Sequence, residues 1–458
     1  MKIPARPPDF DVLMRRLAES MPLTEFLLKI GVPLSDPKYL HWDELRRKPA
    51  PLGFSHEEWW LALKLSRRYT YCTIPLRDKK GDPFRYSMPN MIFEALDGIG
   101  SSAGLLGVRP GVQDVLQRIR ARHLATPMLQ ESITSSQLEG AVTTRAVAEA
   151  MIQSGRSPRD RSERMICNNY QAMQTIMRIK SHPLTPDVIF ELHRILTEGT
   201  LDNPSAAGRF RTSEEPVHVV DPEGLVVHEP PPAEELPLRM VSLCAFANEG
   251  MAATPGTFIS SVLRAIMLHF WLAYDHPFVE GNGRTARALM YWFLLNQGYD
   301  LFEYVSISNV INKARAKYAR AFLYTETDDN DLTYFILHQT DVMRQAIGDL
   351  NEEAARRQRE LQAVEGRLTQ FPGLNQRQQS IIAEALKHPR RDISIKGHQD
   401  LSGIAYATAR ADLLGLKELG LLSLSSRGKA MIFKPVSDLA EQLKGGGVAK
   451  QDGSGGSD

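Results

Sequence analysis

Two strongly apolar stretches, residues 257–274 and about 284–297, do most to limit how this chain can fold. Both have apolar residues at helical spacing around most of the helix surface, which is typical of a helix that is buried or spans a membrane. The first stretch includes Arg264 and His269 and falls short of the roughly 20 apolar residues that a membrane span needs. We therefore expect two buried helices.

Helical spacing of apolar residues continues from about residue 110 to 350, with one interruption. Runs rich in β-branched residues at 216–220 and 225–228 flank the turn sequence Asp-Pro-Glu-Gly. Such runs around a Pro/Gly turn predict a β-hairpin. The predicted fold class is mainly α, with an all-helical core that carries one hairpin.

The last fifth of the chain has its own order of elements. Helix patterns at 376–386, near 398–401 and at 405–419 precede two short strands that end at Phe433. That order predicts a winged helix-turn-helix. The predicted domains are an N-terminal accessory region at 1–100, a helical core at 101–350, a connecting helix at 351–370, the winged helix at 371–440 and a disordered tail at 441–458.

Charge and cysteine content exclude several broad classes of protein. The 458 residues include 55 Lys and Arg against 54 Asp and Glu, and this balance argues against a chain that coats nucleic acid or anionic membrane along its length. Three widely separated cysteines, Cys72, Cys167 and Cys244, fit reduced thiols. The N-terminus lacks the apolar region of a secretion signal. We expect a cytoplasmic protein that does not enter a membrane.

Residues 276–287 join the two apolar helices and read His-Pro-Phe-Val-Glu-Gly-Asn-Gly-Arg-Thr-Ala-Arg. Gly281 and Gly283 permit a tight turn whose backbone N–H groups point inward directly before a helix, and such a nest binds phosphate. Asn282, between them, can donate side-chain hydrogen bonds to the same oxygens. Arg284 and Arg287 share one face of the first helical turn and bring two forked cations to a polyphosphate.

Two further residues of this segment point to chemistry. Glu280 places a carboxylate beside the predicted anion site, which makes sense if a cation such as Mg²⁺ bridges it to phosphate. His276 can take a proton near neutral pH. Singly, each feature has an ordinary structural interpretation, such as a loop, a solvated arginine face, or a histidine in the extended turn that a following proline favours. Together they predict an anion cradle, a metal ligand and a base.

The segment resembles the Fic motif, His-x-Phe-x-(Asp/Glu)-Gly-Asn-Gly-Arg-x-x-Arg, and matches it at every specified position. The resemblance implies an enzyme with a helical Fic core that moves AMP from ATP to a Ser, Thr or Tyr hydroxyl of a target protein. It implies that His276 is the general base, that Phe278 packs the loop into the core and that Glu280 holds Mg²⁺. It assigns the anion hole to Gly281, Asn282 and Gly283, and the β- and γ-phosphate contacts to Arg284 and Arg287.

An upstream segment, Ser-Ser-Gln-Leu-Glu-Gly at 135–140, resembles the inhibitory motif of the same family, (Ser/Thr)-x-x-x-Glu-(Gly/Asn). Ser135 and Glu139 are four apart, so they share a helix face. The resemblance implies that Glu139 pairs with Arg287 through a charge-assisted fork and so replaces the γ-phosphate. It also implies that Gly140 keeps open the space beside the nucleotide. The alternative is an ordinary glutamate on a helix surface.

The predicted hairpin stands where Fic proteins carry a flap that holds the target segment by edge pairing. The flap residues that the resemblance assigns are Val217, His218, Val219 and Val220. A purely structural hairpin is the alternative. The nearby Gly-Arg-Phe-Arg at 208–211 also resembles a family feature, but the sequence assigns it no chemistry.

Residues from Ala405 to Arg410 begin the helix that would be the recognition helix of the winged domain. Nearby basic residues are compatible with contacts to a phosphate backbone: Arg390, Arg391, Lys396, Arg427 and Lys429. Winged helices also dock proteins, so the sequence leaves DNA binding open, as it does homodimer formation. Two other functions remain alternatives: another transfer or AMP removal on the Fic fold, and a DNA-binding regulator that uses the Fic core as a ligand sensor.

Overall fold

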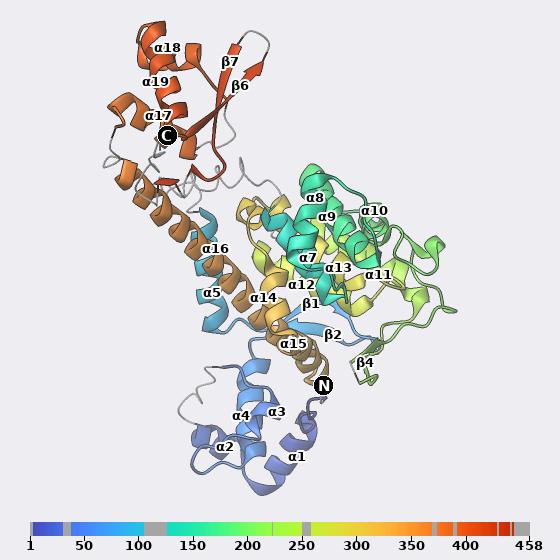
Figure 1. The fold of residues 1–458 in the computed structure, drawn as a ribbon. Helices are drawn as coiled ribbons and strands as arrows, with labels where there is room; N and C mark the ends of the chain where they lie inside the picture. Colours follow the sequence, from blue (N-terminus) through green and yellow to red (C-terminus); the bar gives the residue numbers. More distant parts are fainter. Residues whose placement is uncertain are drawn as a thin grey trace, which may run out of the picture. The chain divides into compact units, whose positions relative to one another are not determined.

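A computed structural model describes residues 3–30, 38–104, 126–221, 223–249, 258–368, 373–387, 392–427, 430–439 and 442–443. The chain divides into two compact units, Met1–Val108 with Ala125–Gly348 and Arg109–Leu124 with Asp349–Asp458. Helices dominate both units and the sheets are small, so the predicted mainly α class is confirmed (Figure 1). No helix within the described segments is long and apolar enough to cross a bilayer.

Two adjacent helices form the centre of the first unit: α12, Ser261–Asp275, and α13, Asn282–Asn296. Nearly all of their side chains are buried, as the apolar pattern predicts. α12 begins after Ser260, whose hydroxyl accepts a hydrogen bond from the backbone N–H of Leu263. α13 begins two residues before its predicted start, so Asn282 and Gly283 belong to its first turn.

Three helices pack on α13 beside α12: α7, Thr126–Leu138; α9, Arg161–Ile179; and α10, Pro186–Thr197. The described part of the helical core also contains α8, Arg145–Ser154; α11, Leu236–Asn248; α14, Ile307–Lys313; α15, Arg315–Thr327; and the first part of α16, Thr333–Leu368. Single 3₁₀ turns lie at Pro204–Ala206, Ala233–Glu235 and Asp300–Glu303. The segment predicted as a separate connecting helix is the second half of α16, because the helix continues without a break from the core.

The predicted hairpin is present, with strands shorter than the runs that predict it. Its strands β3, Val219–Val220, and β4, Val226–His228, pair antiparallel. Within the turn, the Asp221 carboxylate accepts hydrogen bonds from the backbone N–H groups of Glu223 and Leu225. Pro222 lies outside the described residues.

The region predicted as accessory has a small core of its own, centred on Leu13, Phe26, Leu45 and Trp60. Its elements are α1, Phe10–Ser20; α2, Leu23–Ile30; α3, Trp42–Leu45; α4, His56–Arg68; β1, Cys72–Arg77; β2, Pro83–Tyr86; and α5, Asn90–Gly104. It falls in the same compact unit as the helical core.

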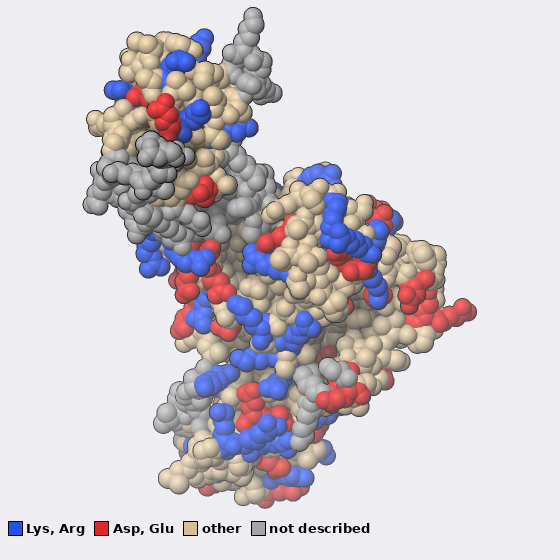
Figure 2. Space-filling model, viewed as in Figure 1, with Lys and Arg blue, Asp and Glu red and all other residues tan. Residues whose placement is uncertain are grey.

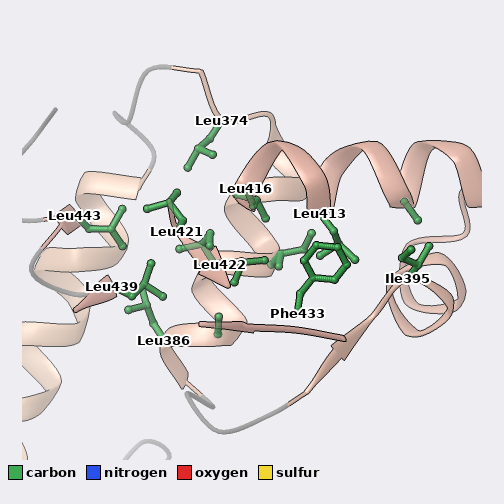
Figure 3. Packing of buried hydrophobic residues seen from close by; sticks show 14 residues of the cluster. Leu374, Leu386, Ile395, Leu413, Leu416, Leu421, Leu422, Phe433, Leu439 and Leu443 are labelled. Carbon is green, nitrogen blue, oxygen red and sulfur yellow. The ribbon is translucent and has the colours of Figure 1, made fainter. Parts of the chain in front are cut away.

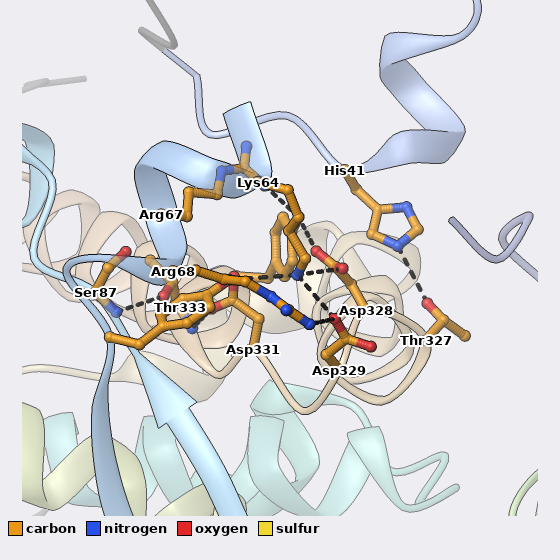
Figure 4. A network of polar contacts seen from close by, with 12 residues as sticks. His41, Lys64, Arg67, Arg68, Ser87, Thr327, Asp328, Asp329, Asp331 and Thr333 are labelled. Carbon is orange, nitrogen blue, oxygen red and sulfur yellow. Dashed lines mark hydrogen bonds and ion pairs between the residues drawn. The ribbon is translucent and has the colours of Figure 1, made fainter. Parts of the chain in front are cut away.

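A buried polar network joins α4 to the turn between α15 and α16 (Figure 4). Lys64 and Asp328 are each only 1% exposed, and the ammonium lies 2.5 Å from the carboxylate. Asp331 accepts hydrogen bonds from Tyr39 and Tyr71. Because an unpaired charge at such a depth is costly, the network fixes the N-terminal region to the core in one register.

The second unit contains α17, Gln376–Lys387; β5, Ile393–Ser394; α18, Ile395–Ser402; α19, Tyr406–Glu418; β6, Leu422–Arg427; and β7, Ala430–Pro435. The antiparallel sheet has the order β5-β7-β6, and β5 is a strand that the sequence does not reveal. Leu413, Leu416 and Phe433 meet in its core (Figure 3). The helices agree with the predicted ones, while the winged-helix identity and the exact domain limits stay predictions. The tail from 444 onward lies outside the described residues.

We predict that Asp328→Ala lowers the free energy of unfolding by about 3 kcal/mol, because the buried Lys64 ammonium would lose its nearest carboxylate and keep the more distant one of Asp329 at 3.6 Å. Urea denaturation followed by circular dichroism measures this. The control is Asp341→Ala, which breaks an exposed ion pair with Arg344 and should cost about 0–1 kcal/mol. Equal losses in the two variants would contradict the structural role of the network.

Candidate active site

His276 ends α12 in an unusual backbone conformation. Its φ of 45° and ψ of 57° lie in the left-handed region. The extended turn that a following proline favours, the ordinary structural interpretation of this histidine, therefore does not form here. Arg211 holds this reversal, since its Nε donates to the His276 carbonyl at 2.9 Å and its backbone N–H donates to the Pro277 carbonyl at 2.9 Å. A strained residue that its surroundings hold in place is typical of a functional site.

The imidazole of His276 is oriented by its own helix. Nδ1 lies 3.2 Å from the Ala273 carbonyl oxygen. A carbonyl only accepts, so Nδ1 carries the proton and Nε2 keeps a free lone pair. Burial lowers the pKa of His276 to about 4, although the Ala273 carbonyl and Glu139 oppose this shift. The neutral ring can therefore accept a proton at neutral pH.

The loop after His276 is closed by Asn282. Its side-chain oxygen accepts from the Phe278 backbone N–H at 2.9 Å, and its Nδ2 donates to the Phe278 carbonyl at 2.8 Å. The sequence led us to expect this amide to point at phosphate, but both of its ends are used within the loop. Phe278 is completely buried and stacks on His193 with ring centroids 3.7 Å apart, as its predicted packing role requires.

His193 also supports the acidic end of the loop. Its Nδ1 accepts from the Gly208 backbone N–H, so its Nε2 donates to the Glu280 carbonyl at 2.8 Å. Gly281, next along the chain, has φ +88°, and a Cβ there would lie 2.8 Å from a methyl group of Thr197. This position therefore accepts only glycine without strain.

Arg287 lies buried at the centre of the site and contacts both predicted inhibitory side chains. Its Nε donates to the Ser135 hydroxyl at 2.9 Å and its Nη2 donates to Glu139 Oε1 at 2.8 Å. Burial alone would raise the pKa of Glu139, but Arg287, with smaller contributions from Arg284 and His276, lowers it. The carboxylate is thus ionised and paired at neutral pH.

The structure gives a reason in the backbone for a glycine at position 140. The α7 helix ends in a Schellman motif, in which the Gly140 N–H donates to the Gln137 carbonyl and the Ala141 N–H to the Ser136 carbonyl. Gly140 has φ +95°, and a Cβ there would meet nothing within 4 Å. The glycine is therefore required by the backbone turn that presents Glu139, and its role beside a nucleotide stays a prediction.

Gly283 is the position where space is decisive. A Cβ on this residue would lie 2.2 Å from Glu139 Oε1 and 3.1 Å from Arg287 Nη1. The Glu139 carboxylate thus lies directly against the backbone of the predicted anion nest.

Arg284 carries buried hydrogen-bond donors that a ligand could satisfy. Its guanidinium is 1% exposed and donates to the Leu196 carbonyl at 2.7 Å, while its Nε and Nη2 have no hydrogen-bond partner. Burial lowers the pKa of this guanidinium. Buried donors without acceptors are costly, and a bound phosphate would satisfy them. The arginine thus fits the predicted triphosphate.

Glu280 is the candidate metal ligand, and its carboxylate contacts Arg161 at 2.6 Å. Among the residues that the structure describes, no three His, Cys, Asp or Glu side chains converge as a metal site. Mg²⁺ commonly binds through one or two carboxylates together with substrate phosphates, so a single glutamate beside a phosphate cradle fits that ion.

Some of these residues line a cavity of about 230 Å³. Its polar side is formed by Glu139, His276, Gly283 and Arg287, and its apolar side includes Tyr318 and Phe322 of α15. Of the four predicted flap residues, Val219 lines this cavity. Val220 is exposed, while Val217 and His218 precede β3.

His228, at the end of β4, joins the flap to the core. Both ring nitrogens face acceptors, the Glu326 carboxylate and the Tyr274 carbonyl, each at 2.8 Å. Burial opposes the charge on this ring, but the Glu326 contact outweighs burial and the pKa of His228 is raised. The hairpin is therefore held to α15 by an ion pair and to α12 by a hydrogen bond at Tyr274, one residue before that helix ends.

Residues 183–294 match the family model described as Fic/DOC family. The chain contains a Fic/DOC family domain. Over 205 residues it is 27% identical to a protein adenylyltransferase Fic of Nematostella vectensis, covering 41% of this chain and 45% of the relative. Over 111 residues it is 36% identical to the protein adenylyltransferase Fic of Drosophila melanogaster, covering 24% of this chain and 20% of that protein. The chain thus matches less than half of the length of these curated relatives.

The fold has a counterpart among solved structures. A crystal structure of a Fic family protein from Desulfovibrio desulfuricans G20 covers 77% of this chain and 98% of its own, with a TM-score of 0.51 and 19% identity. At that identity the likeness shows a shared fold. The matched Fic domain contains the whole segment 276–287, whereas Ser135 and Glu139 lie upstream of it.

The Fic domain depends on three residues that sequence reasoning missed as part of the site: Arg211, His193 and Arg161. Arg211 belongs to the Gly-Arg-Phe-Arg segment, which resembles a family feature but to which the sequence assigns no chemistry. His193 and Arg161 carry no local signal, because their partners Glu280 and Phe278 lie about 85 or more residues away along the chain.

We predict that the His276 ring in the nucleotide-free protein titrates near pH 4, since burial disfavours its charged form. The ring then remains a neutral base as pH falls, until it is protonated near pH 4. Histidine NMR spectra, assigned with His276→Gln, measure this. His228 serves as the internal control, because its pKa is raised. A pKa of His276 at or above 6.5 would contradict the described environment.

Proposed function

We propose that this protein is an autoinhibited protein adenylyltransferase, which moves AMP from ATP to a Ser, Thr or Tyr hydroxyl of a target protein and of itself. The observation that carries the proposal is a buried arginine, Arg284, whose Nε and Nη2 find no acceptor among the described residues. Arg284 and the neutral His276, whose Nε2 is free, both lie near enough to Glu139 to lower its pKa. The protein adenylyltransferases that match part of the chain support it.

The reaction follows from the arrangement of side chains. The target hydroxyl attacks the α-phosphorus, the bond from that phosphorus to the bridging oxygen breaks, and pyrophosphate leaves. His276 Nε2 takes the hydroxyl proton. Arg284 and Arg287 stabilise charge on the β- and γ-phosphates, and the backbone of Gly281, Asn282 and Gly283 forms the anion hole. A Mg²⁺ ion held by Glu280 would neutralise phosphate charge.

The restraint is a competition for Arg287. A carboxylate and a γ-phosphate are both forked acceptors for a guanidinium, and Glu139 holds that position in the free protein. Its contact with the Gly283 backbone also narrows the phosphate nest. ATP that enters while Glu139 stays in place would have its phosphates misaligned for in-line attack.

The flap gives the target a place to bind. β3 is a short strand, and an extended target segment can pair with its edge by main-chain hydrogen bonds. Such pairing makes little demand on target sequence. A different transfer, or removal of AMP, on the same fold remains the alternative function, and the mass added to a modified protein distinguishes it.

We predict that Glu139→Gly raises AMP transfer and self-modification by about 10- to 100-fold, the range expected for loss of a charged hydrogen bond. His276→Ala should lower the activity of that variant by about 10²- to 10⁴-fold. Labelled ATP with Mg²⁺, followed by mass spectrometry, measures both. The control is Glu149→Gly, which removes an exposed ion pair with Arg145. Unchanged transfer in the Glu139 variant would reject the restraint.

A second candidate function concerns the winged helix proposed at 371–440, with α19 as its recognition helix. The exposed residues at the start of α19 include Tyr406 and Arg410, and Lys396 of α18 is exposed. On the face shown in Figure 2, Lys and Arg form separate spots among uncharged residues of this unit. Arg390, Arg391 and Lys429 lie outside the described residues. Because the sequence of 371–440 has no dense basic stripe, we expect few phosphate contacts. Cytoplasmic location and homodimer formation stay predictions.

We predict that the full-length protein binds duplex DNA with a shallow dependence on salt, because few cations are available for phosphate. Arg410→Gln should weaken binding and lower the salt slope by about one. Fluorescence anisotropy at several salt concentrations measures this. An absence of binding at low salt would instead make this unit a protein-docking module and exclude the DNA-binding regulator.

A further inference from the structure

Arg161 forms an ion pair with the one carboxylate that the proposed function gives to a metal. It is the first residue of α9, and its Nη2 lies 2.6 Å from Glu280 Oε1. Its Nε donates to the Thr200 carbonyl at 3.0 Å. The guanidinium is thus held at two points, one on the catalytic loop and one on the segment after α10.

Exposure shows that this pair is built differently from the buried one at Arg287. The side chains of Arg161 and Glu280 are 56% and 40% exposed, whereas Arg287 is 2% exposed. Exposed ion pairs exchange with solvent ions at little cost, because water and salt screen them. An ion that arrives from solution can therefore take the place of Arg161.

The two cations compete for the charge of one carboxylate. Mg²⁺ binds carboxylate oxygens at about 2.0–2.1 Å and demands a nearly ideal octahedron. A guanidinium 2.6 Å from Oε1 occupies that oxygen and repels a second cation at the same carboxylate. Glu280 itself is kept in place by its backbone, since its carbonyl accepts from His193. The exchange thus concerns the Arg161 side chain and not the loop.

We propose that Arg161 competes with the divalent cation for Glu280, so that a guanidinium neutralises this carboxylate until the metal arrives with the nucleotide. The inference rests on the proposed function, because it takes Glu280 as the metal ligand. The metal concentration that the site requires then depends on Arg161 as well as on Glu280. Removal of the Arg161 side chain lets the metal bind at a lower concentration.

The experiment measures metal-dependent nucleotide binding without turnover. Full-length protein is titrated with Mn²⁺ in the presence of α,β-methylene-ATP, in which the bond that would break is blocked. The signal of free Mn²⁺ in electron paramagnetic resonance gives the metal midpoint. Each variant is made in the natural chain and with Glu139→Gly, so that the restraint on Arg287 is tested separately.

Arg161→Gln should lower the Mn²⁺ midpoint by about two- to fivefold, the range expected from an exposed ion pair. Arg161→Lys should recover most of the wild-type midpoint. Arg159→Gln is the matched control: it removes the same charge two residues away, from an exposed side chain, and should leave the midpoint unchanged. A midpoint in Arg161→Gln equal to or above that of wild type overturns the competition.

Glu280→Gln separates this inference from the proposed function. If Glu280 is the metal ligand, the variant loses the metal dependence whether or not Arg161 is present. If the variant keeps the wild-type Mn²⁺ midpoint, Glu280 is not the metal ligand, and both the assigned metal site and the competition are wrong. Loss of metal dependence in Glu280→Gln with no change in Arg161→Gln rejects the competition alone.

Discussion

The reversal of the backbone between α12 and α13 is the constraint on which the rest of the site depends. Two buried helices must be joined within a few residues, and the chain does so with a left-handed residue at His276 and a second positive φ at Gly281. Glycine adopts a positive φ readily, whereas the left-handed conformation of His276 is strained and needs support. Arg211 fixes the first through the His276 and Pro277 carbonyls, and Asn282 closes the loop across Phe278. The same bonds that complete the turn therefore aim the imidazole and the anion nest into one cavity.

Two buried arginines, Arg287 at the cavity and Arg284 on the same helix, create the electrostatic character of the site. Arg287 has a carboxylate partner and Arg284 does not, so one guanidinium is satisfied by Glu139 and the other keeps open donors. Because a low-dielectric interior strengthens such interactions, the proposed restraint on activity would depend on whether a carboxylate or a phosphate is the partner of Arg287. An exposed arginine, Arg161, acts on the acidic side of the loop, where water keeps the pair weak enough to exchange. The more deeply buried pair of Arg287 and Glu139 is therefore held more firmly than the exposed pair of Arg161 and Glu280.

The helices around the cavity are held in turn by contacts far from it. Glu131, near the start of α7, accepts from the backbone N–H of Ser308 at the start of α14, and this fixes the helix that ends at Glu139. The ion pair of Lys64 and Asp328 joins the N-terminal region to the turn after α15. That helix lines the cavity and carries Glu326. The N-terminal region, for which the sequence suggests no chemistry, is therefore a structural support of the core.

The sequence by itself determined the two central helices, the hairpin, the helices of the second unit with strands β6 and β7, and the candidate catalytic segment 276–287. These features follow from local patterns: apolar spacing, turn residues and a complete twelve-residue motif. Tertiary structure alone decided that Asn282 serves the loop, that Gly140 serves a helix end, and that Arg211, His193 and Arg161 support the site. Their partners are distant along the chain or depend on φ angles and burial, and a linear pattern does not encode which buried donors find an acceptor. The chemistry could be predicted locally because its ligands come from one turn, whereas its control depends on which side chains the fold brings against that turn.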